Sequence, residues 1–193
     1  MSDIPSLTTG IFEVMGNLRG YSDTFIETGT LVGGGVSAAA QIGFTTIHSI
    51  EIHQGIHEDA KERLRGIMAL PGVTVNLHLG DSTVLLPQIL SSQYQPCVVL
   101  LDAHIMDGEE RSKSVTSPCP SWNLSCIRND LKALKNAPVH NHAILIDDIQ
   151  WCDRPEMDSI SLLELVNSIL DINPAYRFSK VTDNMLQAIP TQN

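Results

Sequence analysis

Residues 25–36 decide the fold, and they read Phe25-Ile-Glu-Thr-Gly-Thr-Leu-Val-Gly-Gly-Gly-Val36. The apolar pair Phe25-Ile26 is typical of the end of a strand, and helix-forming residues follow the glycines. Glycine permits positive φ and lets a ligand approach the backbone closely. The start of the helix offers free N–H groups and a partial positive charge to a polar ligand. The stretch therefore predicts a strand, a tight ligand-binding turn and a helix, with Glu27 as an acceptor beside the turn.

A glycine-rich turn can also do no more than join a strand to a helix. No Lys followed by Ser or Thr comes after the glycines, which disfavours a phosphate-binding P-loop. The spacing also departs from the G-x-G-x-x-G pattern of ordinary NAD sites, so an NAD-dependent oxidoreductase is disfavoured. Taken alone, the glycines leave the ligand-binding and the purely structural interpretation open.

The composition is that of one globular domain spanning residues 1–193. Hydrophobic residues make up 42% and charged residues 18%, which is ordinary for a folded chain. The net charge of −10 argues against nucleic acid as the partner, because binding a phosphate backbone needs a basic face. The local basic group Arg128, Lys132 and Lys135 is interpreted as a solvated helix face.

Compartment and membrane association follow from what the sequence lacks. No apolar run approaches the ~20 residues needed to span a bilayer, so we expect no membrane partner. The first residues show no basic segment followed by an apolar core, so no secretory signal is expected. The four cysteines show no C-x-x-C spacing, which favours a reducing compartment. These features predict a cytoplasmic protein.

Strand and helix patterns alternate along most of the chain. A leading helix is expected within residues 1–20, and a polar loop with Gly and Pro residues, expected at the active site, over 105–121. Expected strands cover 24–27, 45–51, 73–79, 97–101, 143–146, 176–181 and 185–189. The sequence therefore predicts an α/β fold with a doubly wound, mostly parallel seven-stranded sheet and a C-terminal antiparallel β-hairpin.

Apolar residues at helical spacing predict the faces of the connecting helices. Further helices are expected over 34–42 and around 122–136. The remaining helices are expected to bury Ile56, Ala60, Leu64, Ile67 and Met68; Val84, Leu85, Ile89 and Leu90; and Ile160, Leu163, Val166, Ile169 and Leu170.

Nearly every parallel strand in this prediction ends in an acid. The acids are Glu27, Glu51, Asp81, Asp102 and the pair Asp147-Asp148. In a doubly wound sheet the carboxyl ends of the strands meet at one edge, where ligands bind. Clustered carboxylates repel one another, so a whole row of them favours a ligand site over chance.

Two of these acids suit a nucleoside. Glu51 follows the first loop glycine by about twenty residues, where an acid can accept hydrogen bonds from both hydroxyls of a ribose. Asp81 lies where the amino group of an adenine could donate to it. The alternative for either acid is to cap the helix that follows it.

Asp102, Asp147 and Asp148 form a second constellation. If their strands are neighbours, the three carboxylates converge and offer a hard oxygen site for Mg²⁺ or a similar divalent ion. One of the Asp147-Asp148 pair could instead cap the next segment. His104 follows Asp102 by two residues, so its imidazole could act as a general base in the same cleft.

In this order, five motifs resemble the class I S-adenosylmethionine-dependent methyltransferases. They are most similar to the metal-dependent sugar O-methyltransferases of the macrocin type. The likeness covers about residues 20–150. The motifs are Phe25-Ile-Glu-Thr-Gly-Thr with Gly33-Gly34, Ser49-Ile-Glu51, Gly80-Asp81-Ser82, Leu101-Asp102-Ala-His104 and Ile146-Asp147-Asp148.

The resemblance implies a donor site and a metal site. The loop around Gly29 would take the methionine part of S-adenosylmethionine (SAM), Glu51 the ribose and Asp81 the adenine. The implied cofactor-binding residues are Glu27, Thr28, Gly29, Thr30, Gly33, Gly34, Glu51, Ile52, Gly80, Asp81, Ser82 and Asp102. The implied Mg²⁺ ligands are Asp102, Asp147 and Asp148, with Asp102 and His104 as catalytic residues; the family has an acid where this chain has His104.

The implied reaction is transfer of a methyl group to a hydroxyl of a small molecule such as a sugar or a diol. The chain is shorter than those enzymes at its N-terminus. The lid over the acceptor site would then be missing, or be supplied by residues 105–121 or by a second subunit of a homo-oligomer. Two other classes stay open: a non-catalytic module that binds an adenosine-type ligand, and a metal-dependent enzyme of hydrolase or hydroxylase type. Asp102, Asp147 and Asp148 together favour metal chemistry over simple binding.

Overall fold

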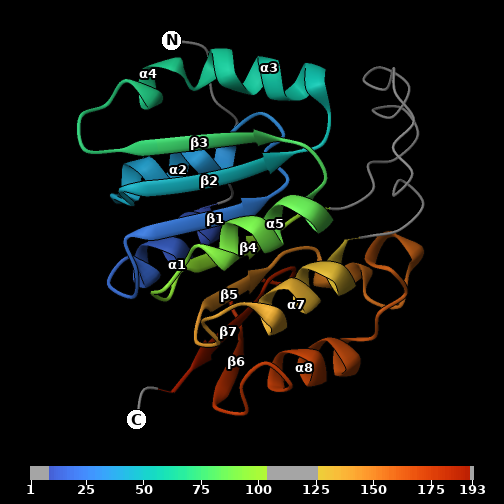
Figure 1. Ribbon diagram of the computed structural model, residues 1–193. Coiled ribbons are helices and arrows are strands. Elements are labelled where there is room, and N and C mark those ends of the chain that lie inside the picture. Colours follow the sequence, from blue (N-terminus) through green and yellow to red (C-terminus); the bar gives the residue numbers. More distant parts are fainter. Residues whose placement is uncertain (1–8, 104–125, 192–193) are drawn as a thin grey trace.

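Seven strands form one sheet in the computed structural model, which describes residues 9–103 and 126–191. The strand order is β3-β2-β1-β4-β5-β7-β6, with β7 antiparallel to both β5 and β6 and the other pairs parallel (Figure 1). The strands are β1 (Thr24–Thr28), β2 (Thr46–Glu51), β3 (Thr74–Leu79), β4 (Val98–Leu101), β5 (Ala143–Ile146), β6 (Tyr176–Lys180) and β7 (Leu186–Pro190). This architecture confirms the predicted doubly wound sheet and its C-terminal hairpin.

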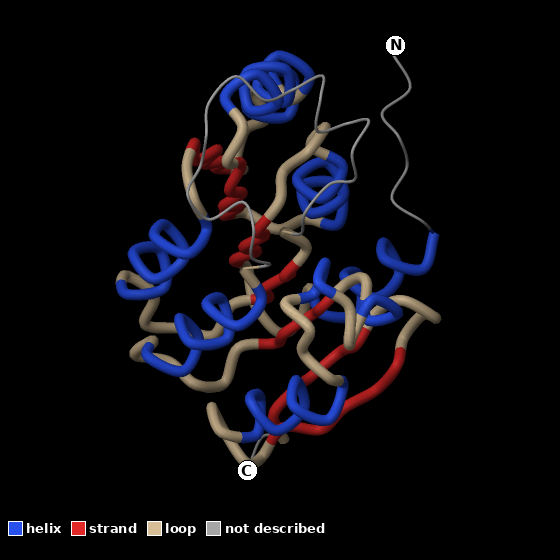
Figure 2. Tube along the Cα trace, turned by 90° about the vertical axis from the view of Figure 1, so that its right-hand side faces the viewer, coloured by secondary structure: helices blue, strands red, loops and turns tan. Residues whose placement is uncertain are grey.

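Helices cover both faces of the twisted sheet (Figure 2). Helices α5, α7 and α8 lie on one face, and α1 and α2 lie on the other (Figure 1). No helix among residues 9–103 and 126–191 is long and apolar enough to cross a membrane. The helices are α1 (Thr9–Leu18), α2 (Gly34–Ile42), α3 (Gln54–Arg63), α4 (Arg65–Met68), α5 (Ser82–Ser91), α7 (Ile127–Asn136) and α8 (Leu162–Leu170), with 3₁₀ turns η1 (Ile149–Trp151) and η2 (Pro155–Met157).

The sheet separates two apolar cores because successive side chains of a strand point to opposite faces. Phe25 packs with the residues of α1 and α2, and its neighbour Ile26 packs with those of α5, α7 and α8. All four residues of β4 and of β5 are buried. A continuous apolar run of this kind is typical of a parallel strand covered on both faces.

The structure corrects several predicted element limits. The described part of the leading helix starts at Thr9, and α7 starts at Ile127 rather than near residue 122. The single helix expected after β2 is broken at Leu64 into α3 and α4. The predicted loop 105–121 and His104 lie outside the described residues.

Three predicted buried positions are wrong. Met68 is 36% exposed, Val84 is 54% exposed and Leu163 is 70% exposed. In α8 the buried residues are Leu165 and Ile169, four positions apart on one face, so Leu163 falls on the opposite side of the helix. In α5 the buried residues are Ser82, Leu86, Ile89 and Leu90, so Val84 falls on the other side of the helix.

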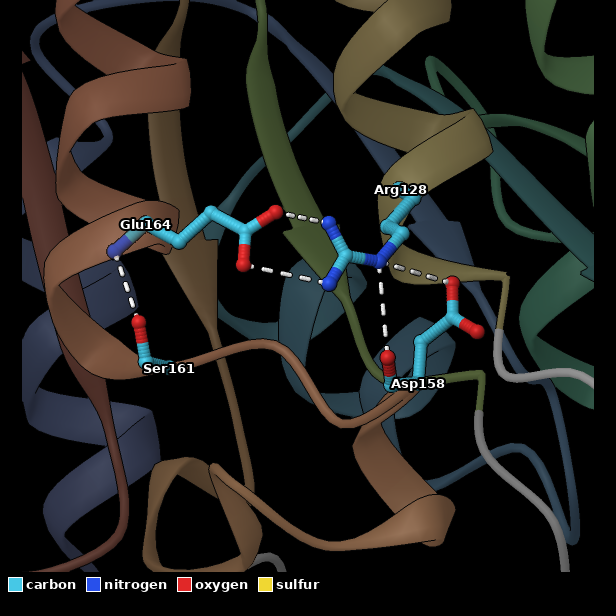
Figure 3. A network of polar contacts seen from close by, with 4 residues as sticks. All are labelled: Arg128, Asp158, Ser161 and Glu164. Carbon is cyan, nitrogen blue, oxygen red and sulfur yellow. Dashed lines mark hydrogen bonds and ion pairs between the residues drawn. The ribbon is translucent and has the colours of Figure 1, made fainter.

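The basic residues of α7 lie on an exposed face of the helix, where two of them form ion pairs. Arg128 lies between Glu164 of α8 and Asp158 (Figure 3). Its Nη2 donates to Glu164 Oε2 at 3.1 Å, and its Nε donates to the Asp158 carbonyl at 3.4 Å. Lys135 pairs with Asp171 at 3.2 Å. These surface ion pairs connect α7 to the residues around α8, and the three basic side chains are exposed, as the sequence analysis expected.

Leucines in a buried and an exposed setting test these burial assignments. Leu145→Ala in β5 is expected to lower the free energy of unfolding by about 2–5 kcal/mol, because it opens a cavity in the core between the sheet and the layer of α1 and α2. Leu163→Ala removes the same atoms from a solvent-facing position and is expected to change it by no more than ~0.5 kcal/mol. Urea unfolding measures both, and similar losses would contradict the assignment of Leu163 to the surface.

Candidate functional site

The carboxyl ends of β1 and β4 meet where the strand order of the sheet reverses. The N–H of Asp102 donates to the carbonyl of Thr28 at 3.2 Å. Gly29 follows with φ +88°, and a Cβ added there would lie 2.9 Å from the Asp102 carbonyl oxygen. Only glycine fits this close backbone approach. The predicted loop therefore lies at the switch point, which is where ligands bind in doubly wound sheets.

Glu27 lies beneath the loop rather than facing an open cleft. Its side chain is 2% exposed, and its Oε1 accepts the Ser49 hydroxyl at 2.7 Å. Ser49 in turn bonds to Thr30 Oγ1 at 2.5 Å. The Glu27 carboxyl also accepts the backbone N–H of Val36 in the first turn of α2. One of the N–H groups that the sequence analysis left for a ligand is thus already paired.

The position of Glu27 dictates a glycine in α2. A Cβ at Gly35 would lie 1.7 Å from Glu27 Oε2, so any larger residue there would displace the Glu27 carboxyl from its partners. Burial raises the pKa of Glu27 to about 8, and the charges of Asp102 and Glu51 add to the rise. Glu27 is therefore protonated near neutral pH in the folded chain.

Glu51 joins the end of β2 to the glycine loop. Its Oε2 accepts the N–H of Leu31 at 3.0 Å, and its Oε1 accepts the N–H of His53 at 2.9 Å. It does not cap α3, because the ring Nδ1 of His53 accepts the Ile56 N–H there. The capping alternative for Glu51 is therefore wrong.

Exposed apolar side chains surround the Glu51 end of the sheet. Leu31, Ile52 and Leu79 are each more than two-fifths exposed. Leu79 is the strand partner of Glu51, Ile52 follows Glu51, and Leu31 is bonded to it through the backbone. The carboxylate thus lies among apolar surface at the sheet edge, a combination that suits a ligand with a flat ring and a hydroxylated part.

Asp81 does cap a helix, as the alternative interpretation had it. Its Oδ1 accepts the Thr83 N–H at 2.8 Å and the Thr83 hydroxyl at 2.7 Å at the start of α5. Gly80 before it has φ +151°, and its N–H donates to the Glu51 carbonyl at 2.8 Å. Asp81 therefore lies beside the Glu51 end of the sheet, held by its own helix.

The predicted metal ligands come from neighbouring strands. Leu101 of β4 pairs with Ile146 of β5, so Asp102 and Asp147 leave the sheet side by side. Burial raises the pKa of Asp102 to about 8, and the charges of Asp147 and Asp148 add to the rise. Asp148 has a left-handed backbone with φ 58°. The structure thus brings the three acids to one place at the sheet edge.

The three acids do not form a ready-made metal cluster. Asp147 Oδ1 accepts the Asp148 N–H at 2.9 Å, and Asp148 Oδ1 accepts the Gln150 side-chain amide at 2.8 Å. Across residues 9–103 and 126–191, no three His, Cys, Asp or Glu side chains are grouped so that they could hold a metal ion. His104, the predicted base, lies outside these ranges.

The sequence analysis missed one acid at this edge, Asp130 of α7. Its side chain is 1% exposed and accepts a hydrogen bond from the Ser82 hydroxyl at 3.3 Å. The signal was present in the sequence, because Ile127, Leu131 and Leu134 place Asp130 on the apolar face of its helix.

Comparison with known proteins identifies related folds. No protein-family model matches the chain, and no curated protein matches its sequence. An O-methyltransferase from Bacillus cereus in complex with S-adenosylhomocysteine (SAH) superposes with a TM-score of 0.61 and 14% identity over 99% of this chain and 84% of that one. The SAH-bound Podospora anserina methyltransferase PaMTH1 superposes with a TM-score of 0.61 and 13% identity over 98% of this chain and 80% of that one.

A third structure shows the same likeness. The O-methyltransferase TomG from Streptomyces achromogenes, involved in tomaymycin synthesis and in complex with SAM, gives a TM-score of 0.59 and 15% identity over 95% of this chain and 79% of that one. At such low identity the likeness establishes the fold, and it extends over nearly the whole chain. This chain therefore has the Rossmann-like fold of these methyltransferases.

The raised pKa of Glu27 predicts how the stability of the fold depends on pH. Between its ordinary value of 4.5 and about 8, the folded chain holds a proton that the unfolded chain has lost. The contribution of Glu27 to stability therefore falls as pH rises through this window, by up to ~1.4 kcal/mol per pH unit. Glu27→Gln is expected to flatten that slope in thermal melts from pH 5 to 8.5.

A matched change controls for the loss of one acid. Glu58 is exposed on α3, so Glu58→Gln is expected to leave the wild-type slope unchanged. A wild-type slope in Glu27→Gln would show that Glu27 is ionised in the folded protein.

Proposed function

We propose that this chain is a SAM-dependent O-methyltransferase that acts on a hydroxyl of a small molecule such as a sugar or a diol. The observation that carries the proposal is the placement of Glu51. Its buried carboxylate ends β2 at the sheet edge, is held by the glycine loop, and lies among the exposed Leu31, Ile52 and Leu79. The bound SAM and SAH in proteins of the same fold support it.

Each loop at this edge is proposed to take one part of the donor. Glu51 would accept the ribose hydroxyls, and Ile52 would lie against the adenine, whose amino group would face the segment Gly80-Asp81-Ser82. The methionine part would lie along Thr28-Gly29-Thr30 and Gly33-Gly34. Glu27 is proposed to act by shaping this loop from beneath, since its carboxyl is already bonded to Ser49 and Val36.

The residues of the chain would align the reactants and handle one proton. SAM supplies an already activated methyl group when bound, so alignment is the main requirement. The contact between Gly29 and Asp102 sets the distance between the donor loop and the acid edge. The acceptor hydroxyl must also lose its proton. His104 is the proposed base, and Asp102 is the second proposed catalytic residue.

A divalent ion such as Mg²⁺ is proposed as a further cofactor. Carboxylate oxygens are the donors that such an ion prefers. Burial raises the pKa of Asp102, the charges of Asp147 and Asp148 add to the rise, and a cation would offset those charges. Asp102, Asp147 and Asp148 would hold it, and it would lower the pKa of an acceptor hydroxyl beside it.

Calorimetric titration with SAH tests the donor site. The wild type is expected to bind SAH and to ignore NAD⁺, with and without Mg²⁺. Glu51→Ala is expected to weaken SAH binding at least ~10-fold, because it removes a charged acceptor of the ribose hydroxyls. Glu58→Ala, at an exposed position of the following helix, is expected to bind as the wild type does. Absence of SAH binding in the folded wild type would overturn the proposal.

Formation of SAH from SAM in the presence of a panel of sugars and diols tests the metal. Activity is expected to disappear in EDTA and to return with excess Mg²⁺. Asp147→Asn is expected to lower it at least ~10-fold by removing a charged ligand, whereas Asp153→Asn, at an exposed left-handed position that Asn accepts, is expected to leave it unchanged. Full activity in EDTA would contradict the metal proposal and leave the donor proposal standing.

A further inference from the structure

A buried carboxylate lies between the sheet and the first turn of α7, apart from the row of acids at the strand ends. Asp130 is 1% exposed and lies on the same helix face as the buried Ile127, Leu131 and Leu134. A carboxylate among apolar side chains is costly unless hydrogen bonds compensate for its lost hydration. Its partners therefore show what it does.

Both described partners of this carboxylate are hydroxyls of the candidate donor site. Ser82, the first residue of α5, donates its hydroxyl to Asp130 Oδ1 at 3.3 Å. Thr28, the last residue of β1, also forms a side-chain hydrogen bond with Asp130. Asp130 thus connects the end of β1 to the start of α5.

The Thr28 hydroxyl also bonds to the backbone that follows β4. Its Oγ1 accepts the backbone N–H of Asp102 and that of Ala103, both at 3.3 Å. A hydroxyl has one proton and two lone pairs, so with both lone pairs engaged its proton goes to Asp130. The carboxylate therefore fixes the orientation in which Thr28 can hold residues 102 and 103.

Cys126 holds the same backbone from the other side. Its Sγ donates to the Ala103 carbonyl at 3.0 Å, and its own carbonyl accepts the Asp130 N–H at 2.8 Å. Ala103 is thus bonded through both its N–H and its C=O by groups that meet at Asp130. The backbone on which Asp102 is placed is over-determined by this network.

We propose that Asp130 is a positioning residue of the donor site, which orients the Thr28 and Ser82 hydroxyls and so fixes the Asp102-Ala103 backbone and the start of α5. The proposal rests on the proposed function for what the site binds. Burial raises the pKa of Asp130 to about 7, and the hydrogen bonds from Ser82 and Thr28 oppose that rise. These two donors therefore favour the charged form.

Asp130→Asn separates positioning from mere space filling. The amide has the shape of the carboxyl group, but one of its two ends is a donor. One hydroxyl then faces an N–H instead of an acceptor and must turn. If Thr28 turns, it can no longer accept both backbone N–H groups, and the 102–103 segment loosens without any change in packed volume.

Amide hydrogen exchange of the ligand-free protein, read by NMR, tests the positioning directly. Asp130→Asn is expected to speed exchange at Ala103 at least ~10-fold while the amides of β2 keep wild-type rates. The effect at Asp102 is expected to be smaller, because its N–H also donates to the Thr28 carbonyl. Asp59→Asn, at an exposed position of α3, is the matched control. A wild-type rate at residue 103 would overturn the proposal. If Asp130→Asn does not fold, Thr28→Val, which removes the hydroxyl alone, decides by the same criterion.

SAH affinity extends the test to the site. Asp130→Asn and Thr28→Val are each expected to weaken SAH binding about 10-fold. The double variant is expected to lose no more affinity than the single variant with the larger loss, because both changes break the same connection. Thr28→Ser keeps the hydroxyl and is expected to retain wild-type exchange rates. If the two losses of SAH affinity add in the double variant, Asp130 and Thr28 do not act through the same connection, and the proposal is wrong. Failure of the wild type to bind SAH would instead count against the proposed function, and the exchange measurement would still decide the role of Asp130.

Discussion

The carboxyl group of Glu27 lies directly under the first turn of α2, and it leaves no room for a Cβ at position 35. The same carboxyl accepts the Val36 N–H, so the end of β1 contacts the first turn of α2. It also orders the chain of hydrogen bonds that runs from Val36 through Glu27 and Ser49 to Thr30. The loop between β1 and α2 consequently has a defined shape before any ligand arrives. Such preorganisation reduces the ordering cost of binding.

Several buried carboxyl groups lie at the same edge of the sheet, and each has different interaction partners. Glu51 is paired with the backbone N–H groups of two loops, and Asp130 is paired with hydroxyls. Burial raises the pKa of Asp102, and the charges of Asp147 and Asp148 add to the rise. A raised pKa of this kind is common at functional sites, and this edge is where the donor and metal sites are proposed.

Much of this arrangement could be predicted from the sequence. Strand periodicity, the buried runs of β4 and β5 and the acids at the strand ends predict the sheet and place Glu51 and Asp102 at one edge. Limits at Leu64 and exposed positions such as Leu163 could not be predicted, because helix breaks and helix rotation depend on tertiary packing. The hydrogen-bond partners of Glu27 and Glu51 could not be predicted either, because they depend on the φ angles of the loop.

The role of Asp130 shows where sequence reasoning stops. Its place on the apolar face of α7 is readable from the spacing of Ile127, Leu131 and Leu134. That it meets Thr28 and Ser82 depends on how α7 packs against α5 and the sheet, which only the structure shows. An acid on the apolar face of a helix therefore indicates a buried polar contact, but only the structure identifies its partners.

The most direct measurement is an NMR titration of glycine-labelled protein with SAH. The chain has 13 glycines spread over the site and the rest of the fold, so their amides report where a ligand binds. The account predicts large shifts at Gly29, Gly33, Gly34 and Gly80, with Gly16, Gly20 and Gly72 unmoved. Shifts confined to the second group, or no shifts at saturating SAH, would contradict the central claim that the carboxyl edge of β1 to β3 is a SAM site.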